Sequence, residues 1–268
     1  MTESVSRSAI DTNGGRTSFR ATGSGPPLVL VHGMQVGQEL FDDVRGHLED
    51  AFTVITYDQR DRGGTWFPVD AYTAVDLADD LAALIRGLGY ERAHVVGTSY
   101  GGMVAQMFAI GHPALLDRLI LASTGQHPFG TGRLPRDAQD LLDDVQGGDE
   151  SAGKALPGRF ASAAAATSKS IAAVKDGTGA SSPEALGRRL AAVRGFDTRG
   201  LLGTVTAPAL VLHGRNDPVI RIEDSVAMAL ELSRGSLLLL DGVGHAWENE
   251  EPETAARLLT AFLGAARA

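Results

Sequence analysis

Residues 94–102 read His94-Val-Val-Gly97-Thr-Ser99-Tyr-Gly101-Gly102 and place a serine between a predicted strand and a predicted helix. The pattern G-x-S-x-G is weak by itself, because glycine-rich turns open many helices in α/β proteins. At a sharp strand-to-helix turn, however, the serine is pushed into a strained backbone conformation, and Gly97 and Gly101 leave the space for it. We therefore expect the Ser99 hydroxyl to stand exposed at the carboxyl edge of a sheet. A helix N-terminus beneath it would favour developing negative charge.

Strands and helices alternate on both sides of this turn. Apolar runs predict strands at 28–31, 52–57, 94–97, 118–122, 209–213 and 236–240. Helical spacing predicts helices at 38–49, 74–88, 100–112, 222–232 and 251–263. Asn13-Gly14-Gly15 predicts a hairpin turn between two further short strands. The alternation predicts an α/β fold in which a mostly parallel, eight-stranded sheet is covered by helices on both faces.

The alternation stops between residues 124 and 199. This stretch is rich in Ala, Gly, Ser and Asp, and it contains helical patches but no convincing strand. We interpret 124–199 as a small helical cap inserted into a core made of 1–123 and 200–268. A chain of 268 residues is long enough to bury a large core, and α/β proteins of this length often form one domain.

Composition excludes several classes of protein. The formal net charge of −9 disfavours nucleic acid or an anionic membrane surface as the main partner. No apolar run reaches the roughly 18 residues of a membrane helix, and the N-terminus lacks the apolar region of a secretory signal. The chain has no cysteine, which excludes disulfides, a thiolate nucleophile and zinc–thiolate sites. These features fit a cytoplasmic enzyme with a small-molecule substrate, and a serine mechanism at Ser99 would need no metal or cofactor.

A serine hydroxyl is a poor nucleophile and needs a base within hydrogen-bond reach. His245 is the best candidate, because Asp241-Gly-Val-Gly-His245 forms a glycine-rich loop just after the last predicted strand. The base in turn needs a carboxylate that holds its tautomer and stabilises the imidazolium. Asp217 follows the strand that ends at His213 and so reaches the same sheet edge, although Asn-Asp-Pro is also ordinary turn chemistry. The chain order Ser, Asp, His is the order of the α/β-hydrolases.

A tetrahedral intermediate also needs two N–H donors for its oxyanion. The backbone N–H of Tyr100, directly after the nucleophile, is one candidate. The other is the backbone N–H of Met34, in the loop His32-Gly33-Met34 that follows the first long strand. Because both donors are main-chain groups, the residue type at position 34 carries little information.

Over nearly its whole length the chain resembles the α/β-hydrolase superfamily. The matching pieces are Val31-His32-Gly33, 57–63, 97–102, Gly214-Arg-Asn-Asp217 and Gly244-His245. Within the superfamily the chain looks most like small capped esterases, enol-lactonases and cofactor-free perhydrolases. The resemblance implies Ser99 as nucleophile, Asp217 as acid, His245 as base, and Met34 and Tyr100 as oxyanion donors. The segment 60–65 departs from the family's tighter D-x-R-G-x-G-x-S loop. Epoxide hydrolases and haloalkane dehalogenases have an aspartate nucleophile, so the serine at position 99 argues against these two branches of the superfamily.

The leading hypothesis is therefore hydrolysis of a carboxylic ester or lactone through an acyl-enzyme. The same triad would also serve C–C bond hydrolysis, perhydrolysis or acyl transfer in natural-product metabolism. A non-catalytic ligand receptor on the same fold is a third alternative.

Specificity is expected to reside in the cap and around the mouth of the site. Trp66 and Trp247 are the candidate substrate contacts. Arg188, Arg189 and Arg194 would either meet a substrate carboxylate or form a solvated helix face.

Overall fold

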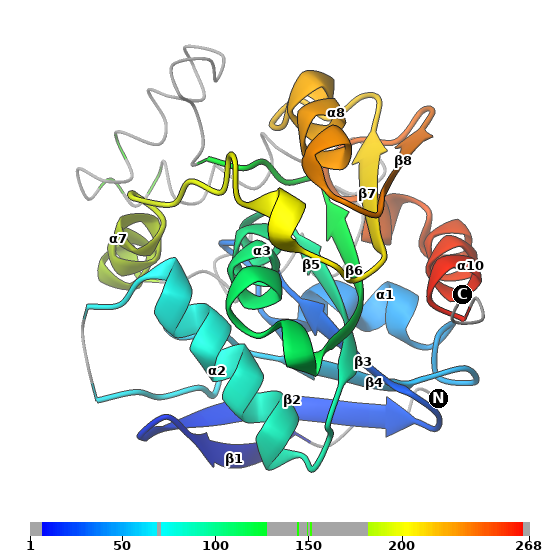
Figure 1. Ribbon diagram of the computed structural model, residues 1–268. Helices are drawn as coiled ribbons and strands as arrows, with labels where there is room; N and C mark the ends of the chain where they lie inside the picture. The colour runs from blue at the N-terminus through cyan, green and yellow to red at the C-terminus, as the bar shows by residue number, and fades with distance from the viewer. Residues whose placement is uncertain are drawn as a thin grey trace.

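The computed structural model describes residues 7–68, 71–127 and 182–264, together with residues 144, 149 and 151. One eight-stranded sheet runs through the molecule in the order β1-β2-β4-β3-β5-β6-β7-β8 (Figure 1). Its strands are β1 (Ser8–Thr12), β2 (Gly15–Gly23), β3 (Pro27–Val31), β4 (Thr53–Tyr57), β5 (Ala93–Thr98), β6 (Leu116–Ala122), β7 (Ala209–Gly214) and β8 (Gly235–Leu240). The sheet confirms the predicted eight-stranded α/β fold.

The first two strands form an antiparallel hairpin, and the rest of the sheet is parallel from β4 to β8. Asn13 and Gly14, the two residues of the hairpin loop, both have positive φ, 46° and 80°. This backbone twist matches that of the flanking strands, and Asn-Gly favours it because these residues tolerate the left-handed region. Parallel strands end at a common edge, so the loops after β3, β4, β5, β7 and β8 meet along one side of the sheet.

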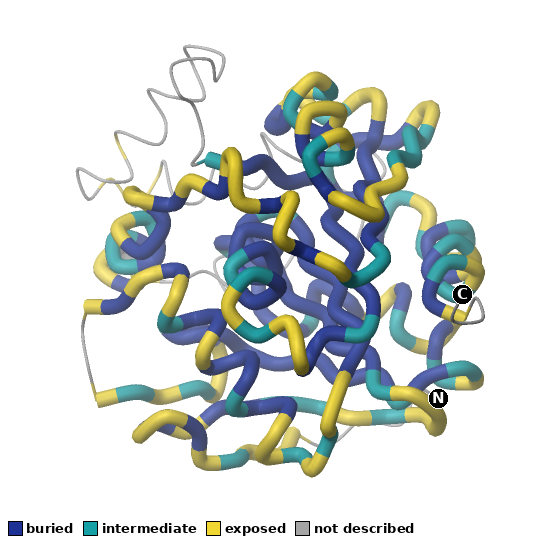
Figure 2. The backbone as a smooth tube through the Cα atoms, in the orientation of Figure 1, coloured by how far each residue is buried: buried dark blue, intermediate teal, exposed yellow. Residues whose placement is uncertain are grey.

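Two apolar clusters cover the two faces of the sheet. Along β3, Val29 and Val31 belong to one cluster while Leu28 and Leu30 belong to the other, as the alternation of side chains along a strand requires. Helices α2 (Ala74–Gly87) and α3 (Tyr100–Gly111) pack on the first face, with α8 (Ile222–Glu231) contributing Met228. On the second face lie α1 (Asp42–Arg45), α9 (Trp247–Glu250) and α10 (Pro252–Leu263). Figure 2 shows the buried centre and the exposed outer sides of these helices.

The predicted helix 38–49 is shorter than expected. The chain forms a 3-10 turn, η1 (Gln38–Phe41), and then one turn of α-helix that ends at Arg45. Gly46 follows, and glycine is a weak helix former because it loses the most backbone entropy. The apolar residues that predicted the helix, Leu40, Phe41, Val44 and Leu48, are nevertheless all buried.

The predicted cap, 124–199, lies largely outside the described residues. At its end the structure has helix α7 (Pro183–Ala192), whose first turn is capped by the Ser182 hydroxyl accepting from the Ala185 N–H. Short 3-10 turns η2 (Pro113–Leu115) and η4 (Leu202–Thr204) precede β6 and β7. Leu186 and Phe196 join the cluster that contains α2 and α3, so α7 packs on the core beside these helices (Figure 1).

Candidate active site

Ser99 occupies the sharp turn between β5 and α3. Its φ of 54° and ψ of −121° lie in a region that residues with a side chain rarely adopt, at a cost of about 1–3 kcal/mol. The turn is possible because two glycines pack against each other and against β3. A Cβ on Gly97 would collide with the Gly101 carbonyl, and a Cβ on Gly101 would collide with the Val31 and His32 carbonyls. The G-x-S-x-G spacing therefore permits a close approach that no larger residue allows.

Neighbouring groups hold the strained turn in place. The Ser99 N–H donates to the Ala122 carbonyl at 2.9 Å, and the Thr124 hydroxyl donates to the Ser99 carbonyl at 2.8 Å. On the other face of the sheet, the Trp247 indole N–H donates to the Thr98 hydroxyl at 3.1 Å. These contacts tie the turn to β6 and to the helical layer behind the sheet.

The structure brings Ser99, His245 and Asp217 together from three separate loops. The Nε2 atom of His245 lies 3.1 Å from the Ser99 Oγ, and its Nδ1 lies 2.9 Å and 3.0 Å from the two Asp217 oxygens. His245 follows β8 and Asp217 follows β7, so both residues reach the edge where β5 ends. The contact between the loops is close, since a Cβ on Gly214 would collide with the Val243 and Gly244 carbonyls.

Main-chain groups fix the Asp217 carboxylate. Its Oδ1 accepts from the N–H groups of Val219 at 2.8 Å and Ile220 at 3.0 Å, and its side chain is fully buried. Burial alone would raise the pKa of Asp217, but His245 and these donors outweigh it and lower the pKa. An ionised carboxylate only accepts hydrogen bonds. The proton on the neutral imidazole is therefore assigned to Nδ1, which leaves Nε2 free to accept from the Ser99 hydroxyl.

The pKa of His245 results from two opposing effects. Burial lowers the pKa of the imidazolium, but the charge of Asp217 and its hydrogen bond raise it, and the net direction is upward from 6.5. Glu248, in α9, is also buried, and burial raises its pKa to about 8.

The loop His32-Gly33-Met34 lies directly beside the nucleophile. A Cβ built on Gly33 would lie 3.7 Å from the Ser99 Cβ. Tyr100 begins α3, and the first N–H groups of a helix have no partner within the helix. The two residues predicted as oxyanion donors, Met34 and Tyr100, thus flank Ser99 from the ends of β3 and β5.

The loop after β4 departs from the family pattern, yet it is extensively bonded. The buried Asp58 carboxylate accepts from the Gln38 N–H at 3.0 Å, the Gln38 amide at 2.8 Å and the Gly64 N–H at 3.2 Å. Arg60 pairs with Asp80 through two hydrogen bonds of 2.6 Å and 3.0 Å. These contacts fasten the loop to η1 and α2.

The two candidate substrate tryptophans lie in different surroundings. Trp247 is 1% exposed and packs beneath the Ser99 turn, so it supports the turn. Trp66 exchanges main-chain hydrogen bonds of 2.7 Å and 2.9 Å with Arg16, and its side chain is 63% exposed beside the β1–β2 hairpin. Strands β4 and β3 separate that hairpin from β5, so the structure does not bring Trp66 together with Ser99.

Sequence reasoning missed Thr124, which bonds the Ser99 carbonyl and has no motif to mark it. It named Arg189, but for a substrate carboxylate or a solvated helix face, whereas the structure places its Nε on the Met34 carbonyl. In the described part of the chain, no group of three His, Cys, Asp or Glu side chains is arranged to hold a metal ion. None of the helices described there is long and apolar enough to cross a membrane.

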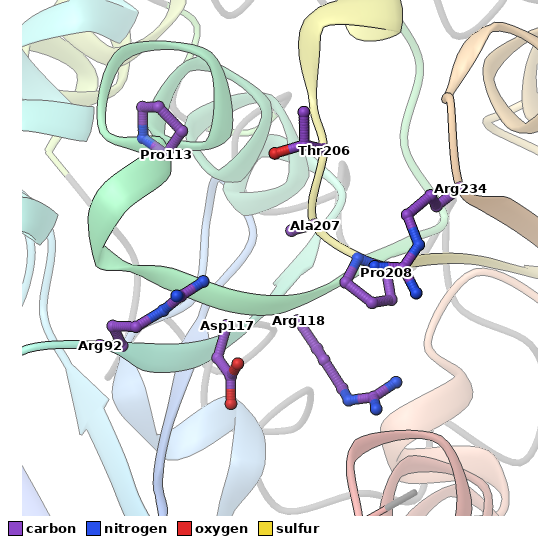
Figure 3. Close-up of a pocket in the computed structure, with 8 residues that line it drawn as sticks. All are labelled: Arg92, Pro113, Asp117, Arg118, Thr206, Ala207, Pro208 and Arg234. Carbon is purple, nitrogen blue, oxygen red and sulfur yellow. The ribbon is translucent and has the colours of Figure 1, made fainter. Parts of the chain in front are cut away.

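A cavity of about 180 Å³ lies at another place on the molecule, and Figure 3 shows the residues that line it. Arg92, Arg118, Arg234 and Asp117 line it, at the amino ends of β5, β6 and β8. This is the sheet edge opposite to the one that carries Ser99, Asp217 and His245, so the cavity is separate from the candidate active site.

The comparisons with known proteins agree with this architecture. An uncharacterized protein of Mycobacterium tuberculosis is 39% identical over 113 residues, 42% of this chain and 33% of that protein, so the match spans about a third of that relative. RutD of Yersinia enterocolitica, named as a candidate carbamate hydrolase, is 30% identical over 91% of both chains. A thermophilic esterase from Thermogutta terrifontis superposes with a TM-score of 0.83 at 26% identity, over 97% of this chain and 98% of that chain.

The family model described as the alpha/beta hydrolase family matches residues 28–258, a range that begins in β3 and ends in α10. It includes the Ser99 turn, the Asp217 loop and the His245 loop. The chain belongs to the alpha/beta hydrolase family.

Proposed function

We propose that this protein is a serine hydrolase that cleaves a carboxylic ester or lactone, with Ser99, His245 and Asp217 as its catalytic triad. The observation that carries the proposal is the continuous hydrogen-bonded chain from the Ser99 Oγ through both ring nitrogens of His245 to Asp217. A hydroxyl, a base and an orienting carboxylate in this order are the requirements for nucleophilic acyl transfer.

In the acylation step, the Ser99 Oγ attacks the carbonyl carbon and transfers its proton to Nε2 of His245. The π electrons of the carbonyl move to oxygen, and this oxyanion accepts hydrogen bonds from the Met34 and Tyr100 N–H groups. When the oxyanion collapses, the C–O bond to the leaving group breaks. The leaving alkoxide takes the proton from His245, and the acyl group stays on Ser99.

Deacylation repeats the step with water as the nucleophile. His245 takes a proton from water, the hydroxide attacks the acyl carbon, and the Ser99 oxygen leaves with the proton that His245 returns. In a lactone the leaving alkoxide is tethered to the acyl group, so one hydroxy acid is released. Every proton in this cycle moves through Nε2 of His245, which is why Asp217 must keep the Nδ1 tautomer.

A carbamate is a second candidate substrate class. The relatives named RutD, as candidate carbamate hydrolases, match this chain at 28–30% identity over about nine-tenths of its length. A carbamate also has an acyl carbon that a serine can attack, so the same site would form a carbamoyl-enzyme. The esterase from Thermogutta terrifontis, at 26% identity, supports the ester substrate in the same way.

The test compares the wild-type protein with Ser99→Ala on a panel of aryl esters, lactones, aryl carbamates and vinylogous diketones. We expect the wild type to hydrolyse esters or lactones and Ser99→Ala to lose at least about 10³-fold in kcat, because the nucleophile is gone. Ser123→Ala is a matched control. Ser123 also has a positive φ, 47°, and follows the neighbouring strand β6, but His245 bonds Ser99 instead.

Mass spectrometry after treatment with a fluorophosphonate gives a second measurement. The proposal expects one adduct, on Ser99, in the wild type and in Ser123→Ala. Full ester turnover by Ser99→Ala would refute the proposal. An unlabelled Ser99 in the wild type would favour a non-catalytic receptor, and diketone cleavage without ester turnover would favour C–C bond hydrolysis.

A further inference from the structure

Arg189 is fully buried beside the candidate active site, although it comes from α7 and lies far from the site residues in sequence. Each of its three nitrogens donates to a main-chain carbonyl. Nε donates to Met34 at 2.9 Å, Nη2 to Gly33 at 3.3 Å and Nη1 to Arg60 at 2.8 Å. Its guanidinium also lies 4.5 Å from the centre of the Tyr100 ring. One side chain thus joins the loops after β3 and β4 to the start of α3.

Two of these bonds act on the peptide that contains a predicted oxyanion donor. The Gly33 carbonyl and the Met34 N–H belong to the same planar peptide group, which is trans, so they point in opposite directions. The Gly33 carbonyl is held by Arg189 and also by Nδ1 of its neighbour His32, at 2.7 Å. Holding this oxygen therefore sets the direction of the Met34 N–H.

The next peptide is held in the same way. Nε of Arg189 bonds the Met34 carbonyl, so both peptide groups that flank the Met34 Cα are fixed by one rigid guanidinium. The His32 ring does not become a second cation beside Arg189. Burial and the nearby Arg189 lower the pKa of His32 to about 3, and its Nε2 accepts from the Gln59 N–H at 3.1 Å. The ring is a fixed neutral donor to Gly33.

We propose that Arg189 is a positioning residue for the oxyanion hole: it holds the peptide between Gly33 and Met34 so that the Met34 N–H points to the oxyanion of the tetrahedral intermediate. The inference rests on the proposed function, because it assigns a role within the same reaction. It also explains why a costly buried charge is kept here. A preorganised donor stabilises the transition state more than a mobile one does.

Binding of a substrate carboxylate, a role considered for the cap arginines from sequence, does not fit Arg189. The Arg189 nitrogens already donate to three carbonyls, and the side chain has no exposed surface. Arg188 bonds both oxygens of Asp61, with Nε at 2.9 Å and 3.1 Å. Asp61 also accepts from the Tyr72 hydroxyl at 2.8 Å. Arg188 thus fastens α7 to the loop after β4, and among the contacts between described residues none joins it to the loop after β3.

This difference makes Arg188 the matched control for Arg189. The experiment compares Arg189→Met, Arg189→Lys and Arg188→Met with the wild type, using an ester that the wild type hydrolyses. It measures kcat and KM, the Tm, and the Kd of an aryl trifluoromethyl ketone. The Ser99 oxygen adds to the carbonyl of this ketone. The adduct carries an oxyanion in the position that the oxyanion of the tetrahedral intermediate would occupy.

For Arg189→Met we expect kcat to fall by about 10- to 100-fold, somewhat less than the 10²–10³-fold loss of a whole donor, because the Met34 N–H is misdirected and not removed. The Kd of the ketone should rise by the same factor, while KM changes by less than about threefold. Arg189→Lys keeps the charge but only one nitrogen, so its kcat should fall between those of wild type and Arg189→Met. Arg188→Met should keep kcat and the ketone Kd within about threefold, whatever its Tm.

A wild-type kcat in Arg189→Met would overturn the inference, and so would equal losses of kcat and ketone binding in Arg189→Met and Arg188→Met. If Arg189→Met does not fold, the inference is tested with Arg189→Lys. An unchanged kcat and an unchanged ketone Kd in that variant would overturn it. A failure of the proposed function would give a different result. The Ser99→Ala variant, in which Arg189 is intact, would then keep full activity.

Discussion

Asp217→Asn is expected to abolish most of the activity while leaving the fold intact, because the structure dictates how the new amide must lie. The Oδ1 atom of Asp217 accepts two main-chain N–H groups, from Val219 and Ile220. An asparagine must present its carbonyl oxygen to these donors and turn its NH2 group towards Nδ1 of His245. Nδ1 then becomes an acceptor, and the ring proton moves to Nε2, which faces Ser99 at 3.1 Å.

The size of the expected loss in kcat follows because His245 no longer acts as a base in Asp217→Asn. With a proton on Nε2, His245 cannot take the hydroxyl proton in the neutral form that dominates at pH 7. The corresponding Asp-to-Asn change in a serine protease triad lowers kcat about 10⁴-fold. That factor corresponds to about 5.5 kcal/mol of transition-state stabilisation. The two main-chain donors keep their acceptor, so we expect a Tm close to that of the wild type.

The assay is steady-state kinetics on the best ester substrate, with circular dichroism to check the fold. Asp241→Asn is the control: Asp241 precedes His245 in the same loop, but its side chain is 96% exposed. It should keep wild-type kcat. A folded Asp217→Asn protein that retains more than a tenth of the wild-type kcat would refute the reasoning, because it would show that the tautomer of His245 does not limit the reaction.

Three further predictions follow from the same contacts. Because Asp217 raises the pKa of His245, kcat/KM should fall as the pH drops through a value above 6.5, and a pH–rate profile with its acid inflection below 6.5 would contradict this. Arg60→Met leaves the buried Asp80 carboxylate without its cation and should lower the free energy of unfolding by about 3–5 kcal/mol in urea denaturation; a change under about 1 kcal/mol would argue against the pair. Trp247→Phe removes the donor to Thr98 and should cost about 1–3 kcal/mol in the same assay, so unchanged stability would show that this bond contributes little.

The sequence predicted the sheet well because its strands are marked by local patterns. Strand β3 is a continuous apolar run, β5 and β6 contain the buried apolar runs Val95-Val96 and Leu119–Ala122, and Asn13-Gly14 marks the hairpin. The separation of Ser99, Asp217 and His245 along the chain did not hinder the prediction. Each residue follows a parallel strand, and parallel strands share a carboxyl edge, so topology alone brings them to one place.

The tryptophans were harder to place because an aromatic residue near a catalytic motif has two compatible positions. Trp247 follows His245 by two residues, and a loop of that length can turn its side chain either to the substrate or to the core. The pattern of the neighbouring residues does not distinguish these outcomes. The structure shows the second, where the indole N–H finds a partner in Thr98 and the ring joins the apolar layer.

Arg188 and Arg189 show why the side chain that holds the His32-Gly33-Met34 loop cannot be identified from the sequence. Neighbouring residues in a helix point about 100° apart. One arginine therefore reaches Asp61 at the edge of α7 while the next enters the core. The donor that we propose Arg189 positions is a main-chain N–H, which any residue except proline would have at position 34. A side chain can position such a donor by bonding the carbonyl at the opposite end of its peptide, and in this protein the side chain to which we assign that role comes from a helix beyond the sixth strand.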